Sequence, residues 1–438
     1  MPSLLVFIKK IFKSDALTGV PLLVALIVAL VWANWLHQLG YERFWHLGIF
    51  DNQLFGVDLS PRFLVNDVLM TLFFYEVGME IRKEMDCGAL KTIKIAFLPI
   101  IAALGGVAMP AMIYTVFNRD SVNINGWAVP TATDIAFAIG LLTLFGKAVP
   151  NSIRAILLSL AIVDDIIAVI IIAIFYSHSG DYYGLIVVAL AIIGLLYCQK
   201  KAFFRGYFYL LALTLVWLGL ALSNIHPSLA GVVVGILIPA NQYPAFFSAA
   251  IISRRKKKRV IYGDKISAAC KTKSISQDHQ STPAVSKFDR VSLLMARALF
   301  NNLRPWVSYV IVPLFILANA GIDFSSLNFN DRESLSVTLG IICALVVGKP
   351  AGIFLASYVA VKLKLCHLPE AINWYSMLWI GLLAGIGFTM SLFIAMLAFD
   401  NTEILKTAKL AVQLGSALSA TLAIIFGILY LRNEKRSS

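Results

Sequence analysis

The chain has 438 residues, of which 59% are hydrophobic and only 14% are charged. Soluble globular domains carry about 25% charged residues, so this composition excludes that class and indicates a helical membrane protein. The formal net charge of +13 would suggest a nucleic-acid partner in a soluble protein, but here it follows the loops between apolar runs. We therefore expect no nucleic-acid partner. The five cysteines are scattered without a metal-binding spacing, and we expect no cofactor.

Long apolar runs recur along the whole chain. A helix needs about 20 mainly apolar residues to cross the hydrocarbon core, and the runs are too continuous for barrel strands. The pattern predicts an all-α polytopic membrane protein with about twelve transmembrane helices, eight within residues 1–252 and four within residues 291–438. The expected spans are 17–36, 62–81, 95–117, 127–145, 153–175, 183–198, 206–222, 226–239, 305–320, 336–361, 374–398 and 405–431.

The loops between these runs indicate the orientation of the chain. Most of the 37 Lys and Arg residues fall in cytoplasmic segments if the N-terminus lies inside, so both termini are predicted to be cytoplasmic. Segment 253–290 is polar and strongly basic, which predicts a flexible cytoplasmic loop that is solvated or touches anionic lipid. The external loop 37–61 carries a hairpin pattern at 46–60, and such a hairpin can support a homodimer.

Two expected spans contain residues that interrupt a helix. Pro130 lies in span 127–145, and Gly385 and Gly387 lie near the middle of span 374–398. Each span is the second of a group of three, 95–175 and 336–431. Interrupted helices at matching positions are typical of inverted-repeat transporters, a rule drawn in part from the family named below. We therefore expect inverted repeats whose interrupted helices cross at mid-membrane and form the site there.

Two adjacent acids, Asp164 and Asp165, lie within the apolar run LSLAIVDDIIAVIII. Placing both at the centre of a spanning helix costs about 5–7 kcal/mol on an insertion scale, so a functional role is favoured. The alternative is a structural role in which each acid bonds a neighbouring helix. Successive helical positions point about 100° apart, so the two cannot share one direction. We expect Asp164 to be the primary cation and proton carrier and Asp165 to assist it.

Three further residues complete the expected site. Asp134 and Thr133 follow the break at Pro130, where unwound backbone and hydroxyl oxygens are available to an ion; Asp134 can also simply cap a helix. Lys349, in LVVGKPAGIF, is a cation far from either end of its span. A buried lysine needs a counter-charge, so we expect it to pair with a buried aspartate, either within the site or as a structural link between helices.

The second span carries its own acids. Asp67 lies within the span, and Glu76, Glu80 and Glu84 recur every four residues on one helix stripe. Such a stripe can attract cations towards the site, or it can be an ordinary cluster at the membrane interface. We treat Asp67, Glu76 and Glu80 as candidates for the access path and its regulation.

A family resemblance rests on these motifs taken together. The segments PTATDIAFAIG, SLAIVDDIIAVIIIAIFY, HPSLAGVVVG, VPLFILANAG, GKPAGI and GIGFTMSLFIA, in this order, resemble the NhaA family of bacterial sodium/proton antiporters. The resemblance runs from about Ser14 to Arg432, apart from the basic loop. It implies an inner-membrane protein that exchanges cytoplasmic Na+ or Li+ for more than one external proton. It also implies that the ion binds at Asp164 and Asp165.

The resemblance assigns roles to the remaining candidates as well. Thr133 and Asp134 would belong to the interrupted-helix assembly, and Lys349 would pair with Asp164 or neutralise the crossing. Asp67 and Glu80 match acids on the path of the ion. One departure concerns the start of the ninth span, where the family pattern has an acid and histidines and this chain has Phe300, Asn301 and Arg304. Glu76 is a second departure, an acid that the pattern does not include.

Two other functions use buried acids. A proton-coupled symporter of a small solute would need aromatic or amide contacts near the acids, and the sequence offers few. An intramembrane aspartyl protease needs two carboxylates that face each other and share one proton. Adjacent acids on one helix diverge, and a buried lysine would disturb such a pair. Exchange of a hard alkali cation for protons on carboxylate oxygens therefore fits the residues best.

Overall fold

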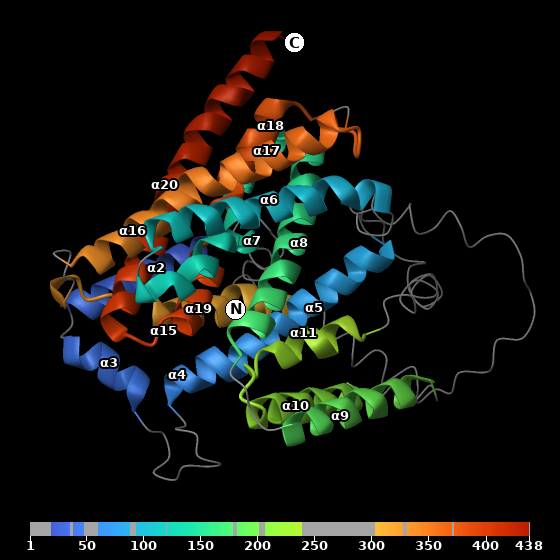
Figure 1. Cartoon of the computed structure of the whole chain (residues 1–438), viewed down its shortest axis with the longest axis vertical. Coiled ribbons are helices and arrows are strands. Elements are labelled where there is room, and N and C mark those ends of the chain that lie inside the picture. The colour runs from blue at the N-terminus through green and yellow to red at the C-terminus, as the bar shows by residue number, and fades with distance from the viewer. Residues whose placement is uncertain are drawn as a thin grey trace, which may run out of the picture.

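The computed structural model describes residues 19–35, 38–47, 60–87, 93–119, 121–177, 182–200, 206–238, 303–326, 331–369 and 372–437, and every regular element in these ranges is a helix. The basic segment 253–290 and most of the expected hairpin at 46–60 lie outside the described residues. An all-helical architecture is what the long apolar runs predict (Figure 1).

Helices occupy all twelve segments that were expected to span the membrane. The first eight segments correspond to α2 (Gly19–Trp35), then α4 (Pro61–Phe63) with η2 (Leu64–Leu69) and α5 (Met70–Cys87), α6 (Ile93–Phe117), η4 (Val122–Thr131) with α7 (Ile135–Leu144), α8 (Asn151–Phe175), α9 (Tyr182–Lys200), α10 (Gly206–Leu222) and α11 (Leu229–Ile236). The last four correspond to η7 (Val307–Ile311) with α15 (Val312–Asn319), α16 (Arg332–Cys343) with η9 (Ala344–Gly348) and α17 (Lys349–Lys362), α18 (Trp374–Ala384) with α19 (Phe388–Ala398), and α20 (Thr402–Ser437).

Fewer than twelve of these helices are long and apolar enough to cross a membrane on their own. Four of the described helices qualify, and seven when each of three bent helix pairs counts as one span. The shortfall has physical causes. The helix through α5 carries several charged residues, and α11 has only eight residues. Three further apolar helices fall just below the length criterion, Tyr183–Gln199, Phe208–Leu222 and Leu303–Asn319.

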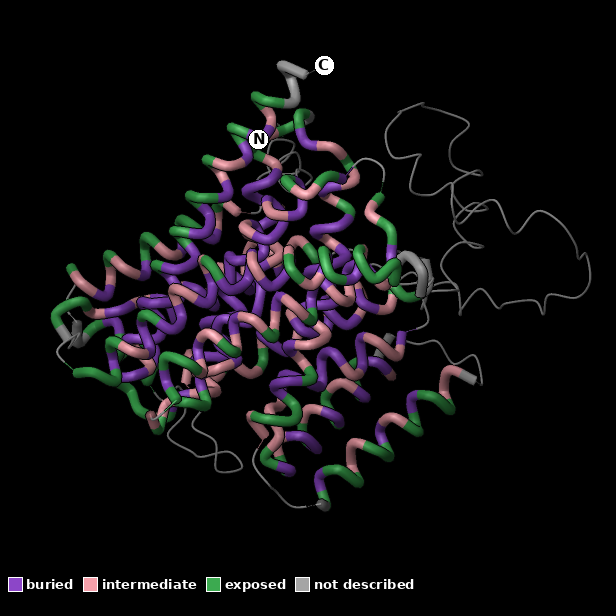
Figure 2. Tube along the Cα trace, turned by 45° about the horizontal axis from the view of Figure 1, so that its top comes forward, coloured by how far each residue is buried: buried purple, intermediate pink, exposed green. Residues whose placement is uncertain are grey.

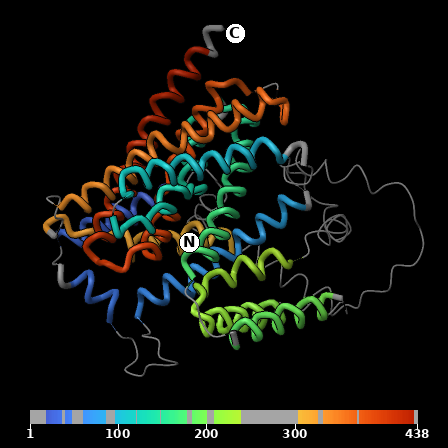
Figure 3. The backbone as a smooth tube through the Cα atoms, viewed as in Figure 1, coloured from blue at the N-terminus to red at the C-terminus, as the bar shows by residue number. Residues whose placement is uncertain are grey.

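The two groups of three spans repeat one order of elements. In the first group the long helices α6 and α8 flank the interrupted pair η4 and α7, which bends by 41°. In the second group the helix from α16 to α17 and the helix α20 flank the interrupted pair α18 and α19, which bends by 50°. The first members of the groups, α6 and α17, pack side by side (Figure 3). This arrangement confirms the predicted pair of interrupted helices.

The outer surface remains strongly apolar. Large hydrophobic side chains are exposed along the peripheral helices, among them Ile27 on α2, Leu190 on α9 and Ile425 on α20. The outer helices carry exposed positions among buried ones, while the centre of the molecule is mostly buried (Figure 2). A soluble monomer rarely exposes apolar surface over so wide an area, so this belt is the surface expected to face lipid.

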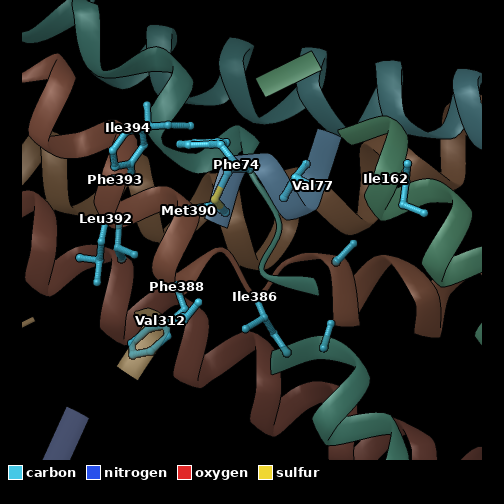
Figure 4. Close-up of a cluster of buried hydrophobic side chains, with 14 of the residues drawn as sticks. Phe74, Val77, Ile162, Val312, Ile386, Phe388, Met390, Leu392, Phe393 and Ile394 are labelled. Carbon is cyan, nitrogen blue, oxygen red and sulfur yellow. The ribbon is translucent and has the colours of Figure 1, made fainter. Parts of the chain in front are cut away.

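An apolar cluster packs around α19 (Figure 4). Phe393 contacts the ring of Phe74 on α5 at 5.4 Å between centroids and that of Phe315 on α15 at 6.2 Å. Ile386, within the break between α18 and α19, and Phe388, the first residue of α19, belong to the same cluster. The cluster therefore holds one of the two breaks against α5 and α15.

Candidate functional site

The two interrupted helices bond to each other at their breaks. Thr133 donates its hydroxyl hydrogen to the carbonyl oxygen of Ala384 at 2.9 Å, and the backbone N–H of Asp134 donates to the carbonyl oxygen of Ile386 at 2.7 Å. Residues 132–134 and 385–387 are not helical, which leaves these groups free to pair. The predicted unwinding after Pro130 is thus present, and the freed backbone groups are used to join the two helices.

Asp134 caps two helices at once. Its Oδ1 accepts from the backbone N–H of Phe137 at 3.0 Å, at the start of α7. Its Oδ2 accepts from the backbone N–H of Thr389 at 3.2 Å and from the hydroxyl of Thr389 at 2.6 Å, at the start of α19. Both helix starts carry partial positive charge, so one carboxylate neutralises two helix ends. The capping role that the sequence left open for Asp134 is therefore present.

Lys349 lies at a helix end of partial negative charge, whereas Asp134 lies at helix starts of partial positive charge. Its ammonium forms an ion pair with Oδ2 of Asp164 at 2.8 Å and also donates to the carbonyl oxygen of Thr131, at the end of η4. Lys349 is 0% and Asp164 1% exposed, so neither charge reaches water. A helix end with unpaired carbonyls carries partial negative charge, which the ammonium offsets. The expected partner of Lys349 is confirmed by this contact.

A cavity of about 490 Å³ lies beside the crossing, and Asp165 is on its wall. We call this space the Asp165 cavity. Asp134 and Thr133 also line it, whereas Asp164 is not among the lining residues. The Oδ1 atoms of Asp164 and Asp165 are both buried without a hydrogen bond to the described residues. The structure thus places Asp165, and not the expected primary carrier Asp164, against open space.

The walls of the Asp165 cavity extend from the crossing, at Asp134 and Thr389, towards residues that the predicted topology places near the cytoplasmic side, such as Arg154 and Arg304. The walls are the first two thirds of α5, the length of α7, the first half of α8 and the start of the helix Leu303–Asn319, and the start of α19 closes the inner end. Glu76 and Glu80 line the cavity from α5, and their role in the access path stays a prediction. Asp67 does not line it and lies near the other end of the same span, in η2.

Three residues that the sequence reasoning passed over take part in this assembly. Thr389 binds Asp134, Ser416 accepts from the backbone N–H of Phe388 at 3.1 Å, and Arg154 lines the cavity and donates to the carbonyl oxygen of Gly146. Thr389 had a usable signal, since it lies two residues after Gly387 at the start of a half-helix. Arg154 and Ser416 had none, because only the packing brings them to the site.

The arrangement of the acidic side chains can be compared with three kinds of site: a resident metal site, a proton-sharing acid pair and a site for a transported cation. Among the described residues no three His, Cys, Asp or Glu side chains come together as a site for a resident metal ion. Asp134 and Asp164 do not form a proton-sharing pair, because their hydrogen-bonded partners are Thr389 and Lys349 respectively. Carboxylate and hydroxyl side chains, among them Asp165, Asp134 and Thr133, line one cavity, and hard oxygen donors of this kind suit an alkali cation as cargo.

Comparison with known proteins matches residues 9–426 to the family model described as Na+/H+ antiporter 1. The chain belongs to the Na+/H+ antiporter 1 family. It is 43% identical to the Na+/H+ antiporter NhaA of Bartonella bacilliformis over 98% of this chain and 94% of that protein. It is 41% identical to the NhaA of Cupriavidus necator, over 97% of this chain and 90% of that protein.

Membership of the Na+/H+ antiporter 1 family confirms the resemblance seen in the motifs, and it makes the chain a multi-pass bacterial membrane transporter rather than an enzyme. The structure describes a residue of each departure from the family pattern. Arg304 lies on the wall of the Asp165 cavity, and its Nε atom is 3.7 Å from Oε1 of Glu76, the second departure. Phe300 and Asn301 lie outside the described residues.

Proposed function

We propose that this chain exchanges cytoplasmic Na+ or Li+ for more than one external proton across the bacterial inner membrane, with both termini in the cytoplasm. The family and the relatives named NhaA support sodium/proton exchange. In the same proposal the exchange is electrogenic, the apolar belt contacts lipid, and the external segment 37–61 supports a homodimer.

The cation and the protons bind in turn to Asp165. The observation that carries this assignment is the position of Asp165 on the cavity wall, with one buried oxygen unpaired, while Asp164 is held by Lys349. The roles expected from the sequence are therefore exchanged, with Asp165 as primary carrier and Asp164 as its neighbour. Thr133 and Asp134 supply further oxygens on the same wall.

Coupling follows from competition for the same oxygens. Asp164, Glu80 and Asp134 oppose a negative charge on Asp165, and Lys349 offsets this repulsion only in part. Either a cation or protons can relieve this repulsion, and binding of one excludes the other. Groups coupled so closely take up protons as a unit rather than singly. Alternating access to the two sides then exchanges Na+ for H+ without a separate coupling device.

Everted membrane vesicles with a dye that reports the pH gradient test this proposal. Addition of Na+ or Li+ to the wild type should dequench the dye over part of a pH series, whereas choline chloride should not. Asp165→Asn should abolish the response, because the amide can neither take up protons nor balance a cation. A wild type that responds to no alkali cation would favour the proton-coupled symporter. A fully active Asp165→Asn variant would overturn the assignment of the carrier.

A further inference from the structure

Six Asp, Glu and Arg side chains line the Asp165 cavity, and three of them, Asp165, Asp134 and Arg154, already have a role or a partner. Asp134 is fixed by its two helix caps, and Arg154 donates to a backbone carbonyl. Glu80 makes no hydrogen bond or ion pair with the described residues. The remaining pair, Glu76 and Arg304, is not explained by the exchange at Asp165.

The Glu76–Arg304 contact is loose. It joins one carboxylate oxygen to Nε alone at 3.7 Å, in place of the two parallel bonds of a strong arginine–carboxylate pair. The side chain of Arg304 is 62% exposed, so its guanidinium can leave for water at little cost. Glu76 is only 17% exposed and faces the cavity. Such a partly exposed pair contributes little stability and can be displaced by another cation.

Glu76 also has the neighbour that a cation site needs. Glu80 follows it by one helical turn on α5 and lines the same cavity, so the two carboxylates share one face of the helix. Their mutual repulsion favours a cation between or beside them. Two independent observations point to a cation here. A cationic group already lies on Glu76, and Asp165, 3% exposed with an unpaired oxygen, lies on the same wall.

We propose that Glu76, together with Glu80, forms an auxiliary binding site for an alkali cation at the mouth of the Asp165 cavity, and that Arg304 is its tethered competitor. The guanidinium neutralises Glu76 while no cation is present, and an arriving Na+ displaces it before passing on to Asp165. This inference rests on the proposed exchange function and adds a step to it. A competitor attached to the protein raises the concentration of Na+ needed to fill the site.

The alternative is that Glu76 and Arg304 merely tie α5 to the start of the helix Leu303–Asn319. The two readings differ in what a charge swap does. A tie is restored when the charges exchange places, as in Glu76→Arg/Arg304→Glu. A cation site is not restored, because the swap removes the inner carboxylate and places a cation beside Glu80.

The experiment measures the Na+ concentration for half-maximal dequenching in everted vesicles, which expose the cytoplasmic face. We expect Arg304→Gln to lower this concentration about two- to fivefold, the range that an exposed charge pair supports. Glu76→Gln should raise it, and the charge swap should raise it further. Arg304→Lys should resemble the wild type because it keeps the competing charge. Lys362→Gln, which removes an exposed cation away from the cavity, is the matched control and should change nothing.

A second readout separates this inference from the exchange function. The shift of the thermal unfolding midpoint of the purified full chain is measured against NaCl, with choline chloride at equal ionic strength. Arg304→Gln should reach its half-maximal shift at a lower Na+ concentration than the wild type, whether or not vesicles show exchange. Equal Na+ dependence of Arg304→Gln and wild type in this assay would overturn the inference, and so would wild-type behaviour of the charge swap. A wild type without exchange but with this binding difference would count against the proposed function alone.

Discussion

At the scale of single residues, the ion pair of Lys349 and Asp164 dominates the electrostatics of the crossing. Both side chains are buried and joined at 2.8 Å, and Lys349 also bonds the end of η4. A buried charge without a partner is far more costly than a buried pair, because neither water nor lipid can replace the lost contact. The intact pair therefore adds little stability, whereas the loss of one partner would leave a buried charge uncompensated.

The first prediction concerns this pair. Lys349→Met leaves the carboxylate of Asp164 without its counter-charge and should lower the free energy of unfolding by about 3–5 kcal/mol. Asp164→Asn in the same chain removes the stranded charge, so the double variant should regain a large part of that loss. Denaturant unfolding of the purified protein in detergent measures both. A double variant less stable than Lys349→Met alone would contradict this reading of the pair.

The residue scale also shows what the sequence could not supply. The position of Asp164 and Asp165 in one helix was enough to predict that they point in different directions. Which of them faces the cavity depends on the rotation of α8, and that rotation is set by contacts with α5, α6, α7 and α18. No local pattern around residues 164 and 165 encodes those contacts. The partner of Lys349 was predictable because a buried ammonium requires an anion.

At the scale of elements, α6 and α17 approach so closely that side chains are excluded between them. A Cβ atom added to Gly352 would lie 2.1 Å from the carbonyl oxygen of Gly105, and one added to Gly105 would lie 2.3 Å from the Cβ of Ala356. Small residues permit this contact between backbones, which is a common way for helices to pack in membranes. The contact places the start of α17, and with it Lys349, beside the crossing.

The second prediction follows from this packing. Gly352→Ala should lower stability by about 1–3 kcal/mol, because the added methyl group forces the two helices apart. Gly194→Ala is the matched control, since nothing lies within 4 Å of an added Cβ there and the position is exposed on α9. It should be neutral or stabilising by up to about 1 kcal/mol. The measurement is the thermal unfolding midpoint of each variant, and equal midpoints for Gly352→Ala and Gly194→Ala would contradict the prediction.

Elements were more predictable than their contacts. The breaks follow from Pro130, which has no backbone N–H to donate, and from Gly385 and Gly387, which weaken a helix. The hydrogen bonds that join the two breaks could not be predicted, because residues 133 and 384 are far apart in sequence and meet only through the fold.

At the scale of the whole molecule, the apolar belt and the distribution of basic residues predict how the chain sits in the membrane. The long apolar runs were enough to predict where helices form. They did not predict how many of the described helices are long and apolar enough to cross a membrane on their own. Helices α5, which carries several charges, and α11, which has eight residues, do not qualify as spans on their own, so we expect them to cross only when packed against their neighbours.

The third prediction tests the orientation. A fluorescent protein that matures only in the cytoplasm should be fluorescent when fused after residue 437, and alkaline phosphatase fused there should be inactive. Both results should reverse for fusions after Arg119, which the topology places outside. A C-terminal phosphatase fusion with high activity would reverse the predicted orientation and would place the mouth of the Asp165 cavity on the external side.

The double cap at Asp134 limits how the protein can move. Its carboxylate holds the starts of α7 and α19 together, and Thr133 and the Asp134 backbone add two further bonds across the crossing. Sliding one interrupted helix past the other would strand a buried carboxylate and several backbone groups at once. If exchange proceeds by alternating access as proposed, we expect the crossing to move as a single rigid body. The gates that open and close then belong to the helices around it.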